Sequence, residues 1–190
     1  MIFNQHSDLE GQHALFGASN YHWINYSEEK MIQTYNNMLA TQLGTELHEL
    51  AARSIKLHRK QRGNDYFAQY VNDAIGFGMS PEVVLYFNEF CFGTADAIKF
   101  DEKKGFLRIH DLKTGATPTH MEQLMVYAAY FCLEYHIKPR DIEMELRIYQ
   151  NPTEKQPECP RIYIPGIDEI VPIYDKAISF SKIMREQSTY

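Results

Sequence analysis

Residues 93–131 read GTADAIKFDEKKGFLRIHDLKTGATPTHMEQLMVYAAYF, and this stretch decides the fold. It begins with branched and aromatic residues that are typical of a β-strand. A polar turn with Gly105 follows, where glycine can adopt the left-handed conformation that a tight turn requires. Residues 106–112 then alternate as the returning strand, and apolar residues recur at helical spacing up to about Tyr135. The stretch therefore predicts a β-hairpin followed by a helix.

The neighbouring segments extend this hairpin into a sheet covered by helices. Upstream, residues 28–60 and 65–76 have helical patterns, and residues 83–90 have the composition of a strand. Downstream, residues 142–149 alternate as a fourth strand, and a loop with several prolines leads to a last helix near residues 168–186. This order predicts an α/β fold with a mixed central sheet flanked by helices.

Length and composition predict a single domain. The chain has 190 residues, of which 44% are hydrophobic and 23% are charged, and these are ordinary values for one globular core. Within residues 1–190 we expect an N-terminal helical part (1–43), a core (44–150) and a C-terminal loop and helix (151–190). The N-terminus lacks the basic start and apolar stretch of a signal peptide, and no apolar run approaches the ~20 residues that cross a bilayer. We therefore expect a cytoplasmic protein without membrane contact.

Charge and cysteine content exclude some classes of function. The net charge of −6 argues against a protein that coats nucleic acid through bulk electrostatics. It is compatible with an enzyme that binds a few phosphates through a local basic patch. Cys91, Cys132 and Cys159 are widely spaced and form no C-x-x-C pair, so we expect reduced thiols and neither a zinc nor an iron–sulfur site.

A D-x-K triplet ends the returning strand of the hairpin. Asp111 and Lys113 are two residues apart, so both side chains point to one face of an extended strand. A carboxylate at that position can bind Mg²⁺ or Mn²⁺, and the lysine can orient an attacking water and offset negative charge. Alone, such a triplet is far more often part of the solvated face of a surface strand.

Asp96 lies in the neighbouring strand among apolar residues. A carboxylate in such a place needs a partner, because its desolvation costs several kcal/mol. One candidate is a lysine, Lys99 or Lys113, in a structural ion pair. The other is a metal ion shared with Asp111. Two carboxylates on a metal ion beside a lysine are the groups that hydrolyse a phosphodiester.

Three residues on helices could complete such a site. Gln123 and Tyr127 are four residues apart and lie on one helix face, beside the apolar stripe. This placement fits a polar pair that reaches into a cleft, and it equally fits an ordinary helix flank. His48 lies at the edge of the apolar stripe of the first long helix. A histidine at such a position is usually a packing residue, and the alternative is a ligand of a transition-metal ion.

A basic run follows His48 on the same helix. It includes Arg53, Lys56, Arg59 and Lys60, and it is the main concentration of positive charge in an acidic chain. Such a run is commonly a solvated helix face. The alternative is a nucleic-acid-binding patch that contacts phosphates.

Four motifs together resemble the PD-(D/E)xK nuclease superfamily, specifically its RecB-like branch. GTELH (44–48) resembles the G-T-x-x-H helix of that branch, and GTADAI (93–98) resembles its G-x-x-D-x-I strand. DLKTG (111–115) resembles its D/E-x-K-T/S-G strand end, and QLMVYAAYF (123–131) resembles its Q-x-x-x-Y-A helix. The motifs occur in the order of the family, on the expected elements.

The resemblance implies a restriction-endonuclease-like fold with an αβββαβ core and a single nuclease domain. It implies a Mg²⁺- or Mn²⁺-dependent deoxyribonuclease, with exonuclease as the expected type and Lys113 positioning the nucleophile. Members with an iron–sulfur cluster use four cysteines, and this chain has three, so no cluster is expected. The catalytic residues implied are Asp96, Asp111, Lys113, Gln123 and Tyr127. The metal ligands implied are His48, Asp96, Asp111 and the backbone carbonyl of Leu112.

The resemblance also implies partners and a setting. DNA is the expected partner, with a recombination or replication protein as a candidate second one. Compact versions of this branch are common in phage genomes, which implies a phage origin and the cytoplasm of a bacterial or phage-infected cell. The alternatives are a non-catalytic module that binds DNA ends or a recombination partner, and a structural protein whose carboxylates form ion pairs. The motifs do not predict polarity, strand preference or oligomeric state.

Overall fold

The computed structural model describes residues 14–115, 119–154 and 156–187. The chain divides into two compact units, one up to Leu43 and one from Gly44 onward. The first unit contains a 3₁₀ helix, η2 (Ala18–Asn25), and the beginning of the long helix α1 (Glu28–Lys56).

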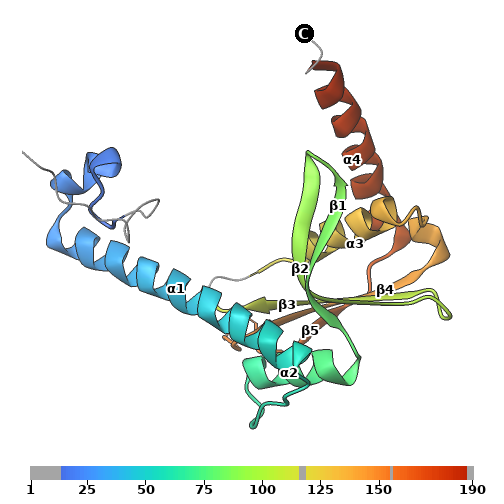
Figure 1. Ribbon diagram of the computed structural model, residues 1–190, viewed down its shortest axis with the longest axis horizontal. Coiled ribbons are helices and arrows are strands. Elements are labelled where there is room, and N and C mark those ends of the chain that lie inside the picture. The colour runs from blue at the N-terminus through green and yellow to red at the C-terminus, as the bar shows by residue number, and fades with distance from the viewer. Residues whose placement is uncertain (1–13, 116–118, 155, 188–190) are drawn as a thin grey trace, which may run out of the picture. The chain divides into compact units, whose positions relative to one another are not determined.

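The second unit is built on a five-stranded mixed sheet with the order β1-β2-β3-β4-β5 (Figure 1). β3 and β4 are parallel, and the other neighbouring pairs are antiparallel. The strands are β1 (Ser80–Asn88), β2 (Cys91–Asp101), β3 (Phe106–Lys113), β4 (Glu143–Gln150) and β5 (Arg161–Tyr163).

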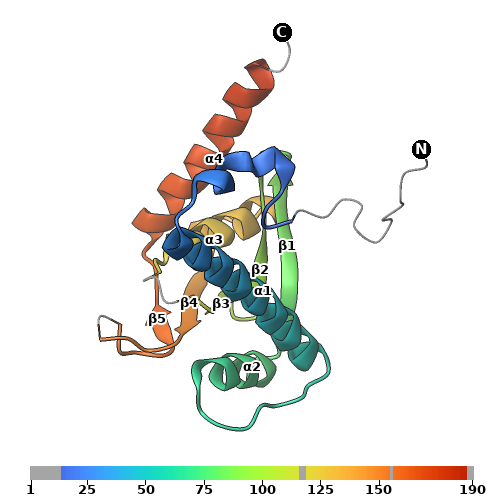
Figure 2. The same cartoon turned by 90° about the vertical axis from the view of Figure 1, so that its left-hand side faces the viewer.

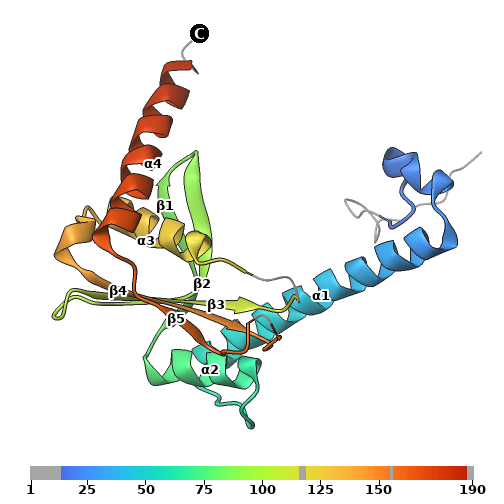
Figure 3. The same ribbon diagram turned by 180° about the vertical axis from the view of Figure 1, so that it is seen from behind.

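Helices cover both faces of this sheet. Figures 2 and 3 show α3 (Glu122–Glu134) and α2 (Tyr66–Gly76) on opposite sides of the strands. α4 (Ile167–Gln187) packs with α3, and the C-terminal part of α1 packs with α2. The predicted α/β architecture, a mixed sheet flanked by helices, is therefore confirmed at this level.

β3 shows why both faces need a helical cover. Leu107 and Ile109 are fully buried in the apolar cluster that includes α3. Leu112 is fully buried in the other cluster, with α1 and α2. β3 is therefore buried on both faces, which requires a helical layer on each side of the sheet.

β2 takes part in two ladders that use different halves of the strand. Its first half, up to Ile98, pairs with β1, and its second half pairs with β3 from Ala97↔His110 to Asp101↔Phe106, so that Ala97 and Ile98 belong to both ladders. In Figure 1 the strand bends between these halves, so that the β1–β2 ribbon turns away from β3 to β5. Asp96 directly precedes Ala97, the residue of β2 at which the pairing with β3 ends.

Two features of the fold differ from the sequence prediction. The predicted proline-containing loop after the fourth strand contains the short edge strand β5. Three residues are too few to show a period-2 pattern, and nearby prolines are typical of a loop. The first long helix, predicted over residues 28–60, ends at Lys56. The last helix, predicted near residues 168–186, is confirmed as Ile167–Gln187 and contains Pro172. Within the described residues, no helix combines the length and the apolar character that a membrane span requires.

Candidate functional site

Three potential metal ligands meet where α1, β1 and β2 come together. His48, Glu82 and Asp96 each place one ligand atom within 4.8 Å of those of the other two. Nδ1 of His48 lies 3.5 Å from Oδ2 of Asp96. Among the described residues this is the only such group of three, and its nitrogen and oxygen donors suit a divalent cation such as Mn²⁺ or Mg²⁺.

Glu82 is a member of this group that the sequence motifs do not include. β1 pairs Pro81 with Ala97 and Val83 with Ala95, so Glu82 lies opposite Asp96. Its backbone has a φ of 52°, in the left-handed region, which costs a non-glycine residue ~1–2 kcal/mol. Such strained conformations concentrate at functional sites. A single glutamate just before the predicted strand of residues 83–90 carries no sequence signal of this role.

Asp96 is held by the backbone of the neighbouring strand. The β2–β3 ladder ends at Ala97↔His110, and the carboxylate of Asp96 accepts a hydrogen bond of 2.8 Å from the amide of Leu112. Neither Lys99 nor Lys113 forms an ion pair with Asp96. The structural ion pair that the sequence left open is therefore absent between these described residues. Ligation by the Leu112 carbonyl stays a prediction.

Asp111 and Lys113 form a pair beside this group. Nζ of Lys113 is 3.0 Å from Oδ2 of Asp111, so the two side chains do point to one face, as predicted. Asp111 is only 2% exposed. Its Oδ2 has no well-aligned hydrogen-bond donor among the described residues, so the contact with Lys113 is an ion pair with poor hydrogen-bond geometry.

The charges of the site act on one another. Burial raises the pKa of Asp111 to about 6, the charge of Asp96 adds to this, and Lys113 opposes it. The Asp96 carboxylate raises the pKa of His48, and burial raises the pKa of Glu82. Crowded carboxylates hold protons more tightly because each resists the charge of the next. A bound divalent cation relieves the same repulsion, so these residues fit a metal ion.

The two predicted residues of α3 lie next to the lysine. Lys113 donates a 2.8 Å hydrogen bond to Oε1 of Gln123, and Nε2 of Gln123 donates a 3.0 Å hydrogen bond to the hydroxyl of Tyr127. The lysine is thus fixed between a carboxylate and an amide. α3 thereby brings the Q-x-x-x-Y pair to the D-x-K triplet.

Two motif glycines allow this close packing. A Cβ on Gly93 would lie 2.9 Å from a ring carbon of Tyr127, closer than real Cβ contacts come. A Cβ on Gly44 would lie 2.8 Å from Oγ1 of Thr114, which follows the D-x-K triplet. Gly93 therefore lets α3 approach β2, and Gly44 lets α1 approach the end of β3.

Part of the basic run borders the same site. A hollow of about 740 Å³ is lined by residues of α1, including His48, Arg53 and Lys56, and by Glu82 of β1. No ion pair joins Arg53 or Lys56 to another residue that the structure describes. Arg59 and Lys60 follow the end of α1 and do not line this hollow, and their predicted contact with nucleic acid stays a prediction.

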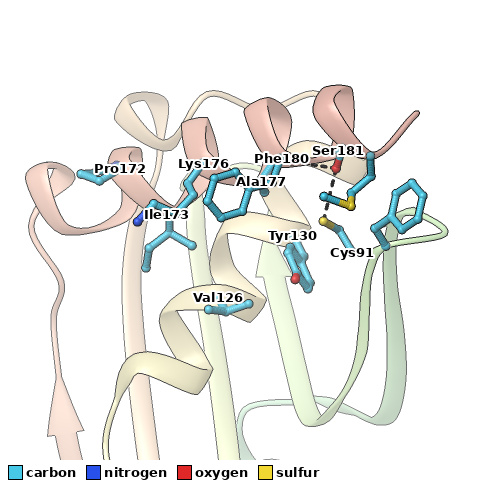
Figure 4. A pocket seen from close by; sticks show the side chains of 11 residues that line it. Cys91, Val126, Tyr130, Pro172, Ile173, Lys176, Ala177, Phe180 and Ser181 are labelled. Atoms are coloured by element: carbon cyan, nitrogen blue, oxygen red, sulfur yellow. Dashed lines mark hydrogen bonds between the residues drawn. The ribbon is translucent and has the colours of Figure 1, made fainter. Parts of the chain in front are cut away.

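A second hollow, of about 650 Å³, lies between α3, α4 and the β1–β2 turn (Figure 4). Its lining is mainly apolar, with Val126, Tyr130, Ile173 and Phe180 among its side chains. None of the predicted site residues lines it. Because apolar side chains supply neither metal ligands nor phosphate contacts, we place the candidate site at the His48, Glu82 and Asp96 group.

Comparisons with protein-family models, curated proteins and solved structures give no match for this chain. The resemblance to the PD-(D/E)xK superfamily therefore stays a prediction, and the function has to be argued from the site.

Proposed function

We propose that this chain is a Mg²⁺- or Mn²⁺-dependent deoxyribonuclease with a restriction-endonuclease-like fold. The observation that carries the proposal is the adjacency of two sets of groups. One is the potential metal-binding group of His48, Glu82 and Asp96. The other is the buried Asp111 paired with Lys113. Metal-assisted hydrolysis of a phosphodiester uses such groups: metal ligands, a buried carboxylate and an ammonium group held in place.

In the proposed reaction each residue of the site would have its own role. His48, Glu82 and Asp96 would hold the cation, with Asp111 and the Leu112 carbonyl as further ligands. When bound, the cation supplies a water molecule of lowered pKa and positive charge at the scissile phosphate. Lys113 would orient the attacking water and offset the charge that develops on the phosphate oxygens. Gln123 and Tyr127 would keep the Lys113 ammonium in place.

The test is DNA cleavage by the purified protein with and without Mg²⁺ or Mn²⁺. Substrates are linear and circular DNA, each single- and double-stranded. We expect the wild type and the control variant Lys99→Ala to cleave, because the Lys99 side chain is exposed and outside the site. We expect Asp96→Asn and Lys113→Ala to lose activity by at least ~10²-fold. Digestion of linear but not circular DNA would identify an exonuclease.

Two outcomes would contradict the proposal. One is equal cleavage by the wild type, Asp96→Asn and Lys113→Ala, because the activity would then come from elsewhere. The other is the absence of metal-dependent cleavage on every substrate. DNA binding without cleavage would instead favour the non-catalytic DNA-binding module.

A further inference from the structure

The β1–β2 ribbon has one covered face and one open face. The covered face includes the fully buried Leu85 and Ala95, and Gly93 contacts Tyr127 of α3 there. On the open face, Tyr86 is 51% exposed and Phe92 is 60% exposed. Two aromatic side chains are therefore presented to solvent on this face, and the 57% exposed Val84 lies next to them toward Glu82 and Asp96.

The open face is continuous with the candidate metal site. The register pairs Tyr86 with Phe92, two residues along each strand from the Val84↔Thr94 pair. The next step along the ribbon brings Glu82 opposite Asp96. With a rise of about 3.3 Å per residue, the aromatic pair lies roughly 13 Å along the ribbon from Asp96. That distance corresponds to a few nucleotides of a DNA strand.

The geometry of the two rings suits a flat, unpaired ligand. Their centroids are 6.3 Å apart and their planes are inclined by 34°. A cross-strand aromatic pair also stabilises a hairpin, and this is the structural alternative. In a duplex the bases stack on one another inside the helix, so only unpaired bases can stack on exposed protein rings.

We propose that Tyr86 and Phe92 form a stacking platform for the unpaired bases of a single DNA strand that enters the candidate metal site. The inference rests on the proposed nuclease function and deepens it, because it assigns single-stranded DNA as the substrate class. The platform binds without base specificity, since every base offers a π-face. The backbone of the same strand then reaches the His48, Glu82 and Asp96 group.

The test is the affinity for a short oligothymidylate, which forms no duplex, with Ca²⁺ in place of Mg²⁺ and Mn²⁺ so that binding is separated from cleavage. Tyr86→Leu and Phe92→Leu keep an apolar side chain on the ribbon but remove the ring. We expect each to weaken binding roughly tenfold. Tyr86→Phe, which keeps the ring, should bind like the wild type.

A control variant and a strand without bases show whether a loss of affinity comes from lost base stacking or from a general effect of removing an aromatic ring. Tyr135 is 52% exposed and its ring packs on Phe131, so Tyr135→Leu removes a comparable ring at another place on the molecule and should leave the affinity unchanged. An abasic strand of equal length offers no bases. The wild type, Tyr86→Leu and Phe92→Leu should therefore bind the abasic strand with equal affinity.

Several results would contradict the proposed stacking platform. These are an absence of oligothymidylate binding by the wild type, leucine variants that bind like the wild type, and an equal loss on the abasic strand. A leucine variant that changes the oligomeric state, with unchanged DNA affinity, would assign the face to a second copy of the chain instead. Failure of the nuclease proposal is seen separately, as absence of metal-dependent cleavage by the wild-type protein.

Discussion

Asp111 is the residue whose burial most clearly opposes stability. Its pKa in the folded protein is about 6, against an ordinary value of 3.8. Folding therefore favours the protonated form. This contributes stability below about pH 3.8, and the contribution is lost as the pH rises through about 6. At neutral pH the metal-free protein carries the full cost of a buried charge.

Asp111→Asn should therefore stabilise the metal-free protein while it reduces cleavage. We expect a gain of about 1–3 kcal/mol at pH 7.5, or roughly 3–10 °C in Tm, because the amide carries no charge to bury. The gain should be much smaller at pH 4. Thermal unfolding in EDTA at both pH values measures it. Asp101→Asn is the control, because Asp101 lies at the β2–β3 turn with a more exposed side chain.

An unchanged or lower Tm of Asp111→Asn at pH 7.5 would show that the ion pair with Lys113 compensates the burial of the carboxylate. The pair of Asp111 and Lys113 would then be a structural ion pair. The strongest support for a catalytic role of Asp111 would be lost.

The same groups predict how metal binding depends on pH. The pKa values of His48, Glu82 and Asp111 are all raised, so in acid solution protons occupy the ligand atoms. A cation can bind only when these protons leave. We expect Mn²⁺ to raise Tm at pH 7.5 by several degrees and to have little effect at pH 5.5. A shift of equal size at both pH values would contradict ligation by these side chains.

At the scale of secondary-structure elements, the packing of α3 on β2 positions the lysine. Gly93→Ala should push the ring of Tyr127 away, because the new Cβ would lie 2.9 Å from it. Gln123 then loses its partner, and Lys113 loses its fixed position. We expect a loss of stability of about 1–3 kcal/mol and a lower kcat with metal binding retained. Cleavage kinetics and the Mn²⁺-dependent Tm measure these effects.

Gly76→Ala is the matched glycine exchange, because a Cβ at Gly76 would meet no atom within 4 Å. It should leave activity unchanged, and it should keep or raise stability, since alanine favours the helix. Equal activity of Gly93→Ala and the wild type would show that Tyr127 tolerates displacement.

The elements also show what the sequence could predict. The alternation of residues 106–112 and the Gly105 turn predict the β2–β3 hairpin, because local rules set them. The D-x-K spacing correctly predicts that Asp111 and Lys113 share a face. Glu82 could not be found in this way. Its place opposite Asp96 depends on the register of two strands and on a left-handed backbone conformation, and neither follows from local composition.

At the scale of the whole molecule, net charge limits how the proposed nuclease would bind DNA. A net charge of −6 gives no general attraction to phosphates. The proposed affinity for DNA would therefore depend on a few basic side chains near the site. Arg53 and Lys56 are exposed and line the hollow that contains His48 and Glu82. Both residues lie in the last turns of α1, where a positive charge also stabilises the helix through its dipole. An experiment must therefore distinguish this structural role from contact with phosphates.

Arg53→Gln and Lys56→Gln should each lower the affinity for single-stranded DNA. Each should also reduce the slope of log K against log salt by about 0.7, the value expected when one phosphate contact on a single strand is lost. Lys103→Gln, an exposed exchange at the β2–β3 turn, is the control for the change in net charge. A structural role at the helix end would lower Tm without changing the slope. Equal slopes for the control and both variants would thus restrict the DNA contact to the metal site and the β1–β2 ribbon.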